Sequence, residues 1–282
     1  MRAMAHINPG SGNSGDPRAD ARSDPRADAR SDSRGGVRVL STELLLHRLR
    51  ALTALAPHEV DLVLSLSEPP KLHAPGTSVC PQEDGSPHRR LIVTGWATRP
   101  RILPDGRRQM LDLVLPGDLM GDRGERRPLA MNPVVALTQV RTIGVGRLVG
   151  AVRDQPNDYP GIVRALAAID REEEARLLDH IVRLGCQSAR QRMAHLLLEL
   201  HQRLAVIGFV HNASFPMPLT QDTLGELLGL SLVHINRIVS QLRREKMVSI
   251  RAGVATIHDF GRLALLADRT DPTHAAQTGA AA

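Results

Sequence analysis

A twenty-residue segment, from Gln221 to Ser240, constrains the fold of this chain more than any other part of its 282 residues. Leucines recur in it where two short helices would pack on each other, which is the pattern of a helix-turn-helix. Gly225 supplies the small residue that the close helix crossing needs, at a cost in helix propensity of about 1 kcal/mol relative to alanine. Gly229 lies at the predicted turn, where a positive φ favours glycine. The segment therefore predicts two short, packed helices joined by a tight turn.

The second helix of this pair is expected to expose a polar face. Ser231 can cap it, and Thr220 or Asp222 can cap the first helix. Asparagine pairs with adenine and arginine with guanine in the DNA major groove, so Asn236 and Arg237 are the candidate base-contacting residues. The full set of predicted DNA contacts is Thr220, Gln221, Ser231, Val233, His234, Asn236, Arg237, Arg243, Arg244 and Arg251.

A two-stranded hairpin is predicted directly after these helices. Residues 247–250 and 254–257 would form its strands, and residues 251–253 its turn, which makes the unit a winged helix. Five basic residues and one acidic residue lie between Ser231 and Arg251, so this stretch carries +4 of the net charge of +6. That charge favours contact with DNA phosphates, with Arg251 at the tip of the hairpin. The chain has only five aromatic residues, which argues against a surface that stacks unpaired bases.

The sequence pattern of about residues 70 to 150 is typical of a β-roll or barrel. Glycine and proline recur in this stretch between short apolar runs. Four strands are predicted at 91–93, 110–115, 134–137 and 140–145, with a turn at 104–106. Two short helices are expected upstream, between Val39 and Leu66.

A long helix is predicted after Pro160, followed by a second helix that begins at about Ala189 and ends near Gly208. The apolar stripe of the long helix fits two arrangements: a helix that lies on its own domain, or a dimerisation helix that meets a second copy of the chain. The candidate dimerisation residues are Ile162, Leu166, Ile169, Leu177, Ile181 and Leu184.

These patterns predict an α+β fold in five parts. Both ends are expected to be disordered, because the repeated octad of aspartate and arginine near the N-terminus and the Ala- and Thr-rich C-terminus can bury little apolar surface. The predicted parts are a disordered tail (1–36), a β-roll sensor domain (37–155), dimerisation and linker helices (156–210), a winged helix-turn-helix (211–269) and a second disordered tail (270–282).

This order of parts resembles the Crp/Fnr superfamily of bacterial transcription regulators, in the group common in alphaproteobacteria. The resemblance covers roughly residues 40–267 and is carried by stretches at 91–97, 102–110, 115–119 and 219–237. It implies a cyclic-nucleotide-binding-like jelly roll and a homodimer on a near-palindromic DNA operator, with RNA polymerase as a further partner. Arg237 matches the family position that contacts guanine. Val233 falls where the family usually has glutamate, so the half-site is expected to differ from the usual one.

The resemblance also locates a candidate effector pocket in the β-roll. Its residues are Gly117, Asp118, Leu119, Arg126 and Arg127. The first three resemble the turn that holds the ribose in cyclic-nucleotide-binding relatives, but Ala130 and Met131 stand where the phosphate-binding arginine and its neighbour belong. A phosphate site without that arginine lacks a charge-assisted anchor, and the two nearby arginines replace it only if the loop shifts. A cyclic nucleotide is therefore disfavoured, and the effector stays unidentified.

Cysteine and histidine positions bear on metal cofactors. No cysteine precedes Cys80, so the N-terminal cysteine cluster that holds an iron–sulfur centre in oxygen-sensing relatives is missing, and such a centre is not expected. His195 and His201 lie six positions apart on a predicted helix and point to different sides, so no metal site is predicted there. Cys80 and Cys186 are each either inert or a thiol switch.

The function expected from these features is that of a cytoplasmic, sequence-specific DNA-binding regulator whose β-roll senses a signal. The alternative is a β-roll sensor or scaffold that acts mainly through protein partners. No nucleophile elbow, phosphate loop or zinc signature appears, so an enzyme is not expected. No stretch approaches the ~20 apolar residues that a membrane span needs, so no membrane partner is expected.

Overall fold

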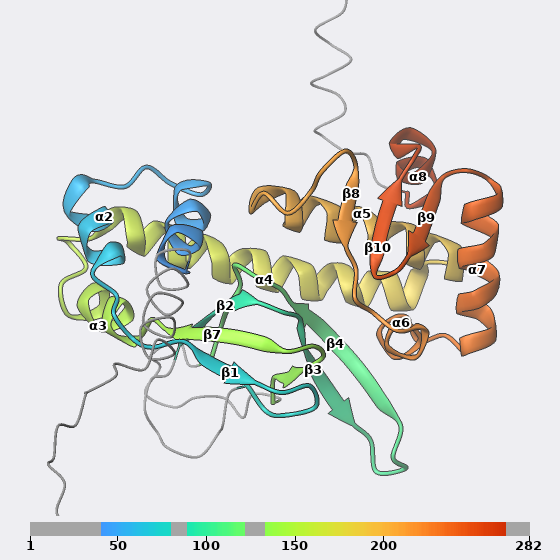
Figure 1. Ribbon diagram of the computed structural model, residues 1–282, viewed down its shortest axis with the longest axis horizontal. Coiled ribbons are helices and arrows are strands. Elements are labelled where there is room, and N and C mark those ends of the chain that lie inside the picture. Colours follow the sequence, from blue (N-terminus) through green and yellow to red (C-terminus); the bar gives the residue numbers. More distant parts are fainter. Residues whose placement is uncertain (1–40, 80–88, 122–132, 269–282) are drawn as a thin grey trace, which may run out of the picture.

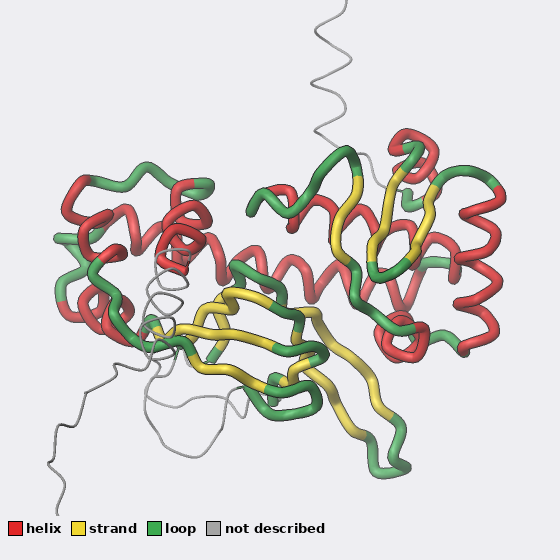
Figure 2. Tube along the Cα trace, in the orientation of Figure 1, coloured by secondary structure: helices red, strands yellow, loops and turns green. Residues whose placement is uncertain are grey.

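The computed structural model describes residues 41–79, 89–121 and 133–268. Two β-sheets and several short helices form an N-terminal unit, and the long helix α4 (Pro160–Cys186) runs from it to a second, mostly helical unit (Figure 1). Figure 2 shows the strands gathered into two separate groups along this helix. The predicted α+β class, with β-roll, long helix and winged helix-turn-helix in that order, is confirmed. Within these ranges no helix is long and apolar enough to cross a membrane.

Several sequence predictions fall on residues outside the described ranges. They concern the two tails, together with Cys80, Arg126, Arg127, Ala130 and Met131.

The β-roll consists of two antiparallel sheets. One has the strand order β1-β7-β2-β5 and the other the order β4-β3-β6. Between them they enclose a small apolar core that includes Ile92, Val114 and Met120. The strands are β1 (Lys71–His73), β2 (Arg90–Thr94), β3 (Ala97–Ile102), β4 (Arg108–Val114), β5 (Leu119–Met120), β6 (Val135–Ala136) and β7 (Val140–Gly144).

The four predicted strands are confirmed as β2, β4, β6 and β7, and the turn at 104–106 joins β3 to β4. Sequence reasoning missed β1, β3 and β5. β1 and β5 are too short for an alternating pattern to show. β3 carries Arg99 and Pro100, and Arg99 is buried because it forms an ion pair with Glu173 of α4, which a local pattern cannot reveal.

Among the described residues, three short helices pack around the first half of α4. Residues 41–50 are helical, as is α2 (Pro57–Leu64), so both helices expected before residue 66 are present. A third helix, α3 (Gly146–Asp154), was not predicted. Apolar side chains from all of these helices join one core with α4, including Leu45, Val63 and Leu148.

Glu59 ties α2 to the start of α4. Its buried carboxylate accepts backbone N–H bonds from Ala56 at 2.7 Å, from Gly161 at 2.6 Å and from Ile162 at 3.0 Å. Burial by itself raises the pKa of Glu59, but these bonds outweigh it and the pKa is lowered. A Cβ on Gly161 would lie 2.4 Å from this carboxylate, so the junction requires glycine. The carboxylate satisfies N–H groups that the first turn of a helix leaves unpaired.

The predicted apolar stripe of α4 divides into two halves with different surroundings. Its first half, Ile162, Leu166 and Ile169, is buried in the core of its own chain. These three side chains are therefore unavailable to a second copy, which corrects their assignment to a dimer contact. In the second half Leu177 and Leu184 are partly buried, whereas Ile181 is 65% exposed, beside the exposed Leu178 and Val182.

Up to residue 268, where the described part of the chain ends, the C-terminal unit packs four helices against a small sheet. The predicted hairpin is confirmed as β9 and β10, but the sheet has a third strand, β8, which pairs with β10 and was not predicted. The elements are α5 (Ala189–Val206), β8 (Ser214–Pro216), α6 (Gln221–Leu228), α7 (Leu232–Arg244), β9 (Val248–Arg251), β10 (Val254–Ile257) and α8 (Phe260–Leu266). The core of this unit also takes in Trp96, Met110 and Leu113 of the β-roll.

Candidate nucleic-acid interface

The helix-turn-helix is formed by α6 and α7. The Thr220 hydroxyl caps α6 by accepting the Thr223 N–H at 3.1 Å, and the Ser231 hydroxyl caps α7 by accepting the His234 N–H at 3.4 Å. Both caps agree with the sequence prediction. Gly229, at the turn, has φ 64°, in the left-handed region that favours glycine. Local sequence therefore sets both the start of α7 and its direction relative to α6.

Gly225 lies where the backbone of the turn comes closest to α6. The Leu230 N–H donates to the Gly225 carbonyl oxygen at 3.0 Å, and a Cβ on Gly225 would lie 2.7 Å from the Leu230 carbonyl oxygen. That distance is shorter than normal contacts, so glycine is required by the close approach and is more than a tolerated replacement for alanine.

One face of α7 is buried and the other faces solvent. Ile235, Ile238 and Leu242 point into the core. Asn236 and Arg237 lie on the exposed face, and their side chains form no hydrogen bond or ion pair with any other residue that the structure describes. The other predicted contacts on α7 and at the two helix starts are also exposed: Thr220, Gln221, Ser231, Val233, His234, Arg243 and Arg244. Figure 1 shows α7 along the outer edge of the C-terminal unit, away from the β-roll.

The wing ends in a tight turn. Ala252 and Gly253 both have positive φ, 49° and 74°, which closes the hairpin between Arg251 and Val254. The Arg251 side chain is exposed at this turn. The structure thus gives the chain an exposed helix with free hydrogen-bonding side chains and a separate basic loop, two features that suit a groove and a flanking phosphate.

The β-roll touches the helix-turn-helix directly. Arg108 of β4 donates through Nε and Nη2 to the two carboxylate oxygens of Glu226 on α6, at 2.8 and 2.9 Å. Gln109 donates to the Glu226 carbonyl oxygen at 2.8 Å. Sequence reasoning missed this contact, because its members lie more than a hundred positions apart and no local pattern links them.

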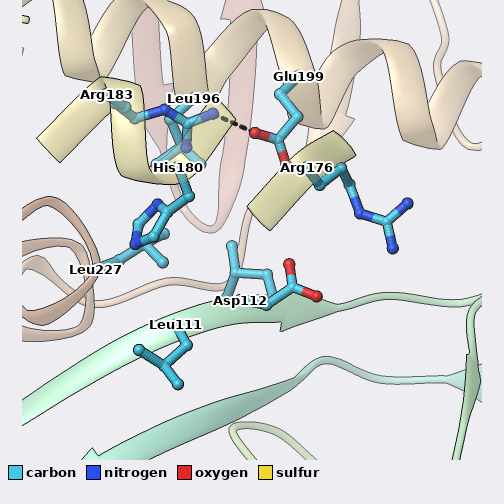
Figure 3. Close-up of a pocket in the computed structure, with 9 residues that line it drawn as sticks. Leu111, Asp112, Arg176, His180, Arg183, Leu196, Glu199 and Leu227 are labelled. Atoms are coloured by element: carbon cyan, nitrogen blue, oxygen red, sulfur yellow. Dashed lines mark hydrogen bonds and ion pairs between the residues drawn. The ribbon is translucent and has the colours of Figure 1, made fainter. Parts of the chain in front are cut away.

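A buried charge network joins the β-roll, α4 and α5. Arg203 of α5 pairs with Asp118 at 2.5 Å and with Glu199 at 3.2 Å, and Arg183 of α4 also donates to Glu199 (Figure 3). Arg203 further donates to the Leu113 carbonyl oxygen at 2.8 Å. These paired charges lie where the sensor unit meets the first helix of the DNA-binding unit, so a change in one unit can alter the contacts of the other.

The candidate effector residues that lie within the described ranges have structural roles here. Asp118 accepts the Leu115 N–H at 2.7 Å and pairs with Arg203, so its carboxylate is already bound by protein. Gly117 is buried with φ 86°, and Leu119 is buried in the core of the N-terminal unit. The turn therefore links the β-roll to α5. No group of three or more potential metal-ligating side chains occurs in the ranges that the structure covers. Cys186 is exposed at the end of α4.

Comparison with known proteins finds similarity to a helix-turn-helix domain family and to bacterial regulatory proteins. Residues 191–266 match the family model of the Crp-like helix-turn-helix domain. The chain is 27% identical over 195 residues to the nitrogen fixation regulation protein FixK of Bradyrhizobium diazoefficiens, which is 68% of this chain and 79% of that protein. It is 31% identical over 176 residues to the transcriptional activator protein FnrL of Cereibacter sphaeroides, which is 61% of this chain and 69% of that protein.

The fold also matches a solved structure, that of FixK2 from Bradyrhizobium japonicum. The TM-score is 0.59 at 24% identity, and the match covers 71% of this chain and 98% of the other. At this level of identity the match concerns the fold alone. It agrees with the arrangement of β-roll, long helix and winged helix described above.

Proposed function

Because the chain belongs to the Crp/Fnr family of transcription regulators, and is a DNA-binding regulator and not an enzyme, we propose that it binds a near-palindromic operator as a homodimer. In this proposal α7 enters the major groove, the β-roll senses a signal, and the bound dimer acts through RNA polymerase. A regulator of this kind works in the cytoplasm, where bacterial DNA lies.

One observation carries the proposal: Asn236 and Arg237 are exposed side by side on α7, with no intramolecular partner among the described residues. Arg237 would donate two bonds to a guanine and Asn236 would pair with an adenine. Val233, 68% exposed on the same face, offers only apolar contact, which suits a thymine methyl group. Thr220 and Arg251 flank this face and would contact phosphates.

The direct test is the substitution Arg237→Ala. Loss of a bidentate guanine contact is expected to cost ~1–3 kcal/mol, a weakening of roughly 5- to 150-fold, and to relax the preference for one base pair. Fluorescence anisotropy with a DNA site selected by the wild-type protein measures this loss. The control is Arg153→Ala, which removes the same charge from an exposed position on α3. Equal affinity of wild type and Arg237→Ala for the selected site would refute the assignment of α7.

A further inference from the structure

A cavity of about 300 Å³ lies between the two units of the chain. Its walls are the turn after β4 (residues 115–118), one face of α4 and one face of α5, with Arg48 at its edge. It is therefore separate from the space between the two sheets of the β-roll. Its size is at the lower end of the range for small-molecule sites in proteins.

Most of the charged groups around this cavity already have partners in the protein. Arg48 pairs with Glu172, and Arg203 pairs with Asp118 and Glu199. Two arginines thus face three carboxylates, and the remaining negative charge is balanced by Arg183, which also pairs with Glu199.

Two side chains of opposite charge on the cavity wall lack such direct partners. Arg176 and Asp179 lie one turn apart on α4, and neither side chain has a hydrogen bond or ion pair with any part of the chain that the structure describes, although the Arg176 charge helps to lower the pKa of Asp118 and Glu199. The Nε atom of Arg176 is buried without a partner. Figure 3 shows its guanidinium turned away from the Arg183–Glu199 pair.

The rest of the wall is apolar. Leu115 and Pro116 contribute from the turn, and Val206 and Ile207 from the end of α5. A ligand that fits this wall needs an apolar body, a negative group for Arg176 and a positive group for Asp179. An α-amino acid with an apolar side chain has all three, with its two charges close together, as they are on α4.

We propose that this cavity binds an apolar α-amino acid, with the carboxylate on Arg176, the ammonium on Asp179 and the side chain against Val206 and Ile207. The bound amino acid would link α4 to α5, the helix that leads into the helix-turn-helix. The idea that the bound amino acid alters the affinity for DNA rests on the proposed function. Binding of the amino acid to the cavity does not depend on it.

Calorimetry on the full chain without DNA tests the site, with L-leucine as the probe. Saturable binding of one leucine per chain is expected. Isocaproate lacks the ammonium and isoamylamine lacks the carboxylate, and each should bind at least about tenfold more weakly, because one charge-assisted contact is lost. Arg176→Gln and Asp179→Asn should weaken leucine by a similar factor. Arg164→Gln removes an exposed charge from α4 outside the cavity and should leave the affinity unchanged.

Three outcomes would overturn the assignment: no saturation at millimolar leucine, equal binding of either single-charge analogue, or unchanged affinity in both cavity variants. Asp179 is exposed, so the Asp179→Asn variant is expected to fold normally. It can therefore test the site even if the Arg176→Gln variant fails to fold. Because the calorimetry uses no DNA, failure to find an operator would leave this result unaffected.

Discussion

Gly225 and Gly150 are both glycines inside helices, but their surroundings differ. A Cβ on Gly225 would lie 2.7 Å from the Leu230 carbonyl oxygen, whereas a Cβ on Gly150 of α3 would meet no heavy atom of the described residues within 4 Å. Alanine has about 1 kcal/mol more helix propensity than glycine. Gly150→Ala should therefore raise the free energy of unfolding by about that amount. Gly225→Ala should lower it by roughly 1–3 kcal/mol, because the backbone of the turn must move. Urea denaturation measures both, and equal stabilisation by the two substitutions would contradict the close approach.

Asp112 and Glu199 are buried carboxylates whose pKa values move in opposite directions. Burial raises the pKa of Asp112 to about 6, in spite of Arg203 and other nearby guanidinium groups. Burial also raises the pKa of Glu199, but Arg183 and Arg203 outweigh it and lower the pKa to about 2. Stability from protonated Asp112 is thus present below its ordinary pKa and lost as the pH rises to about 6. Stability from ionised Glu199 is present above its ordinary pKa and lost as the pH falls toward 2.

The two carboxylates can be separated by substitution. Asp112→Asn cannot ionise, so this variant should not show the part of the stability loss that wild type shows between about pH 4 and pH 6. Glu199→Gln should cost about 3 kcal/mol or more near neutral pH, because two buried arginines lose a charged partner. Free energies of unfolding measured in urea across this pH range give both results. An Asp112→Asn protein with the wild-type pH dependence would show that Asp112 ionises as an ordinary carboxylate.

At the scale of elements, the second half of α4 carries an apolar face without a partner among the described residues. Leu178, Ile181 and Val182 are 57%, 65% and 52% exposed, unlike the first half of the stripe. We expect this face to pair with its counterpart in a second copy. Ile181→Glu should convert the dimer to a monomer in sedimentation velocity, because the pairing would bury an unpaired charge. Ile102→Glu is the control, since Ile102 is 69% exposed at the end of β3. A dimer that survives Ile181→Glu would place the subunit contact elsewhere.

The contact between β4 and α6 is of a different kind. The Arg108 and Glu226 side chains are 48% and 27% exposed, and pairs this accessible contribute at most about 1 kcal/mol. The helix-turn-helix is therefore held against the β3–β4 hairpin of the β-roll partly by an ion pair whose attraction is weakened by solvent. Such a contact suits a regulator in which the two units change position.

At the scale of the whole molecule, the parts that the sequence predicts well are those that depend on near neighbours. The helix-turn-helix needs Gly229 at the turn and Ser231 three residues before the N–H that it accepts, and both are visible in twenty residues. β3 was missed because its buried Arg99 pairs with Glu173, far away in the sequence, and with Asp112 of the neighbouring strand β4. The assignment of the whole apolar stripe of α4 to a dimer contact was wrong for its first half. The same helical repeat packs against the core of its own chain in the first half of α4 and reaches an exposed face in the second half. A helical repeat of apolar residues predicts that one face of a helix is buried, but it does not identify the surface that covers this face.

Selection of bound sequences from a random DNA pool with the full chain directly tests whether a homodimer recognises DNA through α7. We expect enrichment of two inverted half-sites whose centres lie about one helical turn apart, each with a guanine that Arg237→Ala no longer selects. A pool that stays random after repeated rounds, or an enriched site without inverted repeats, would contradict a homodimer that recognises DNA through α7.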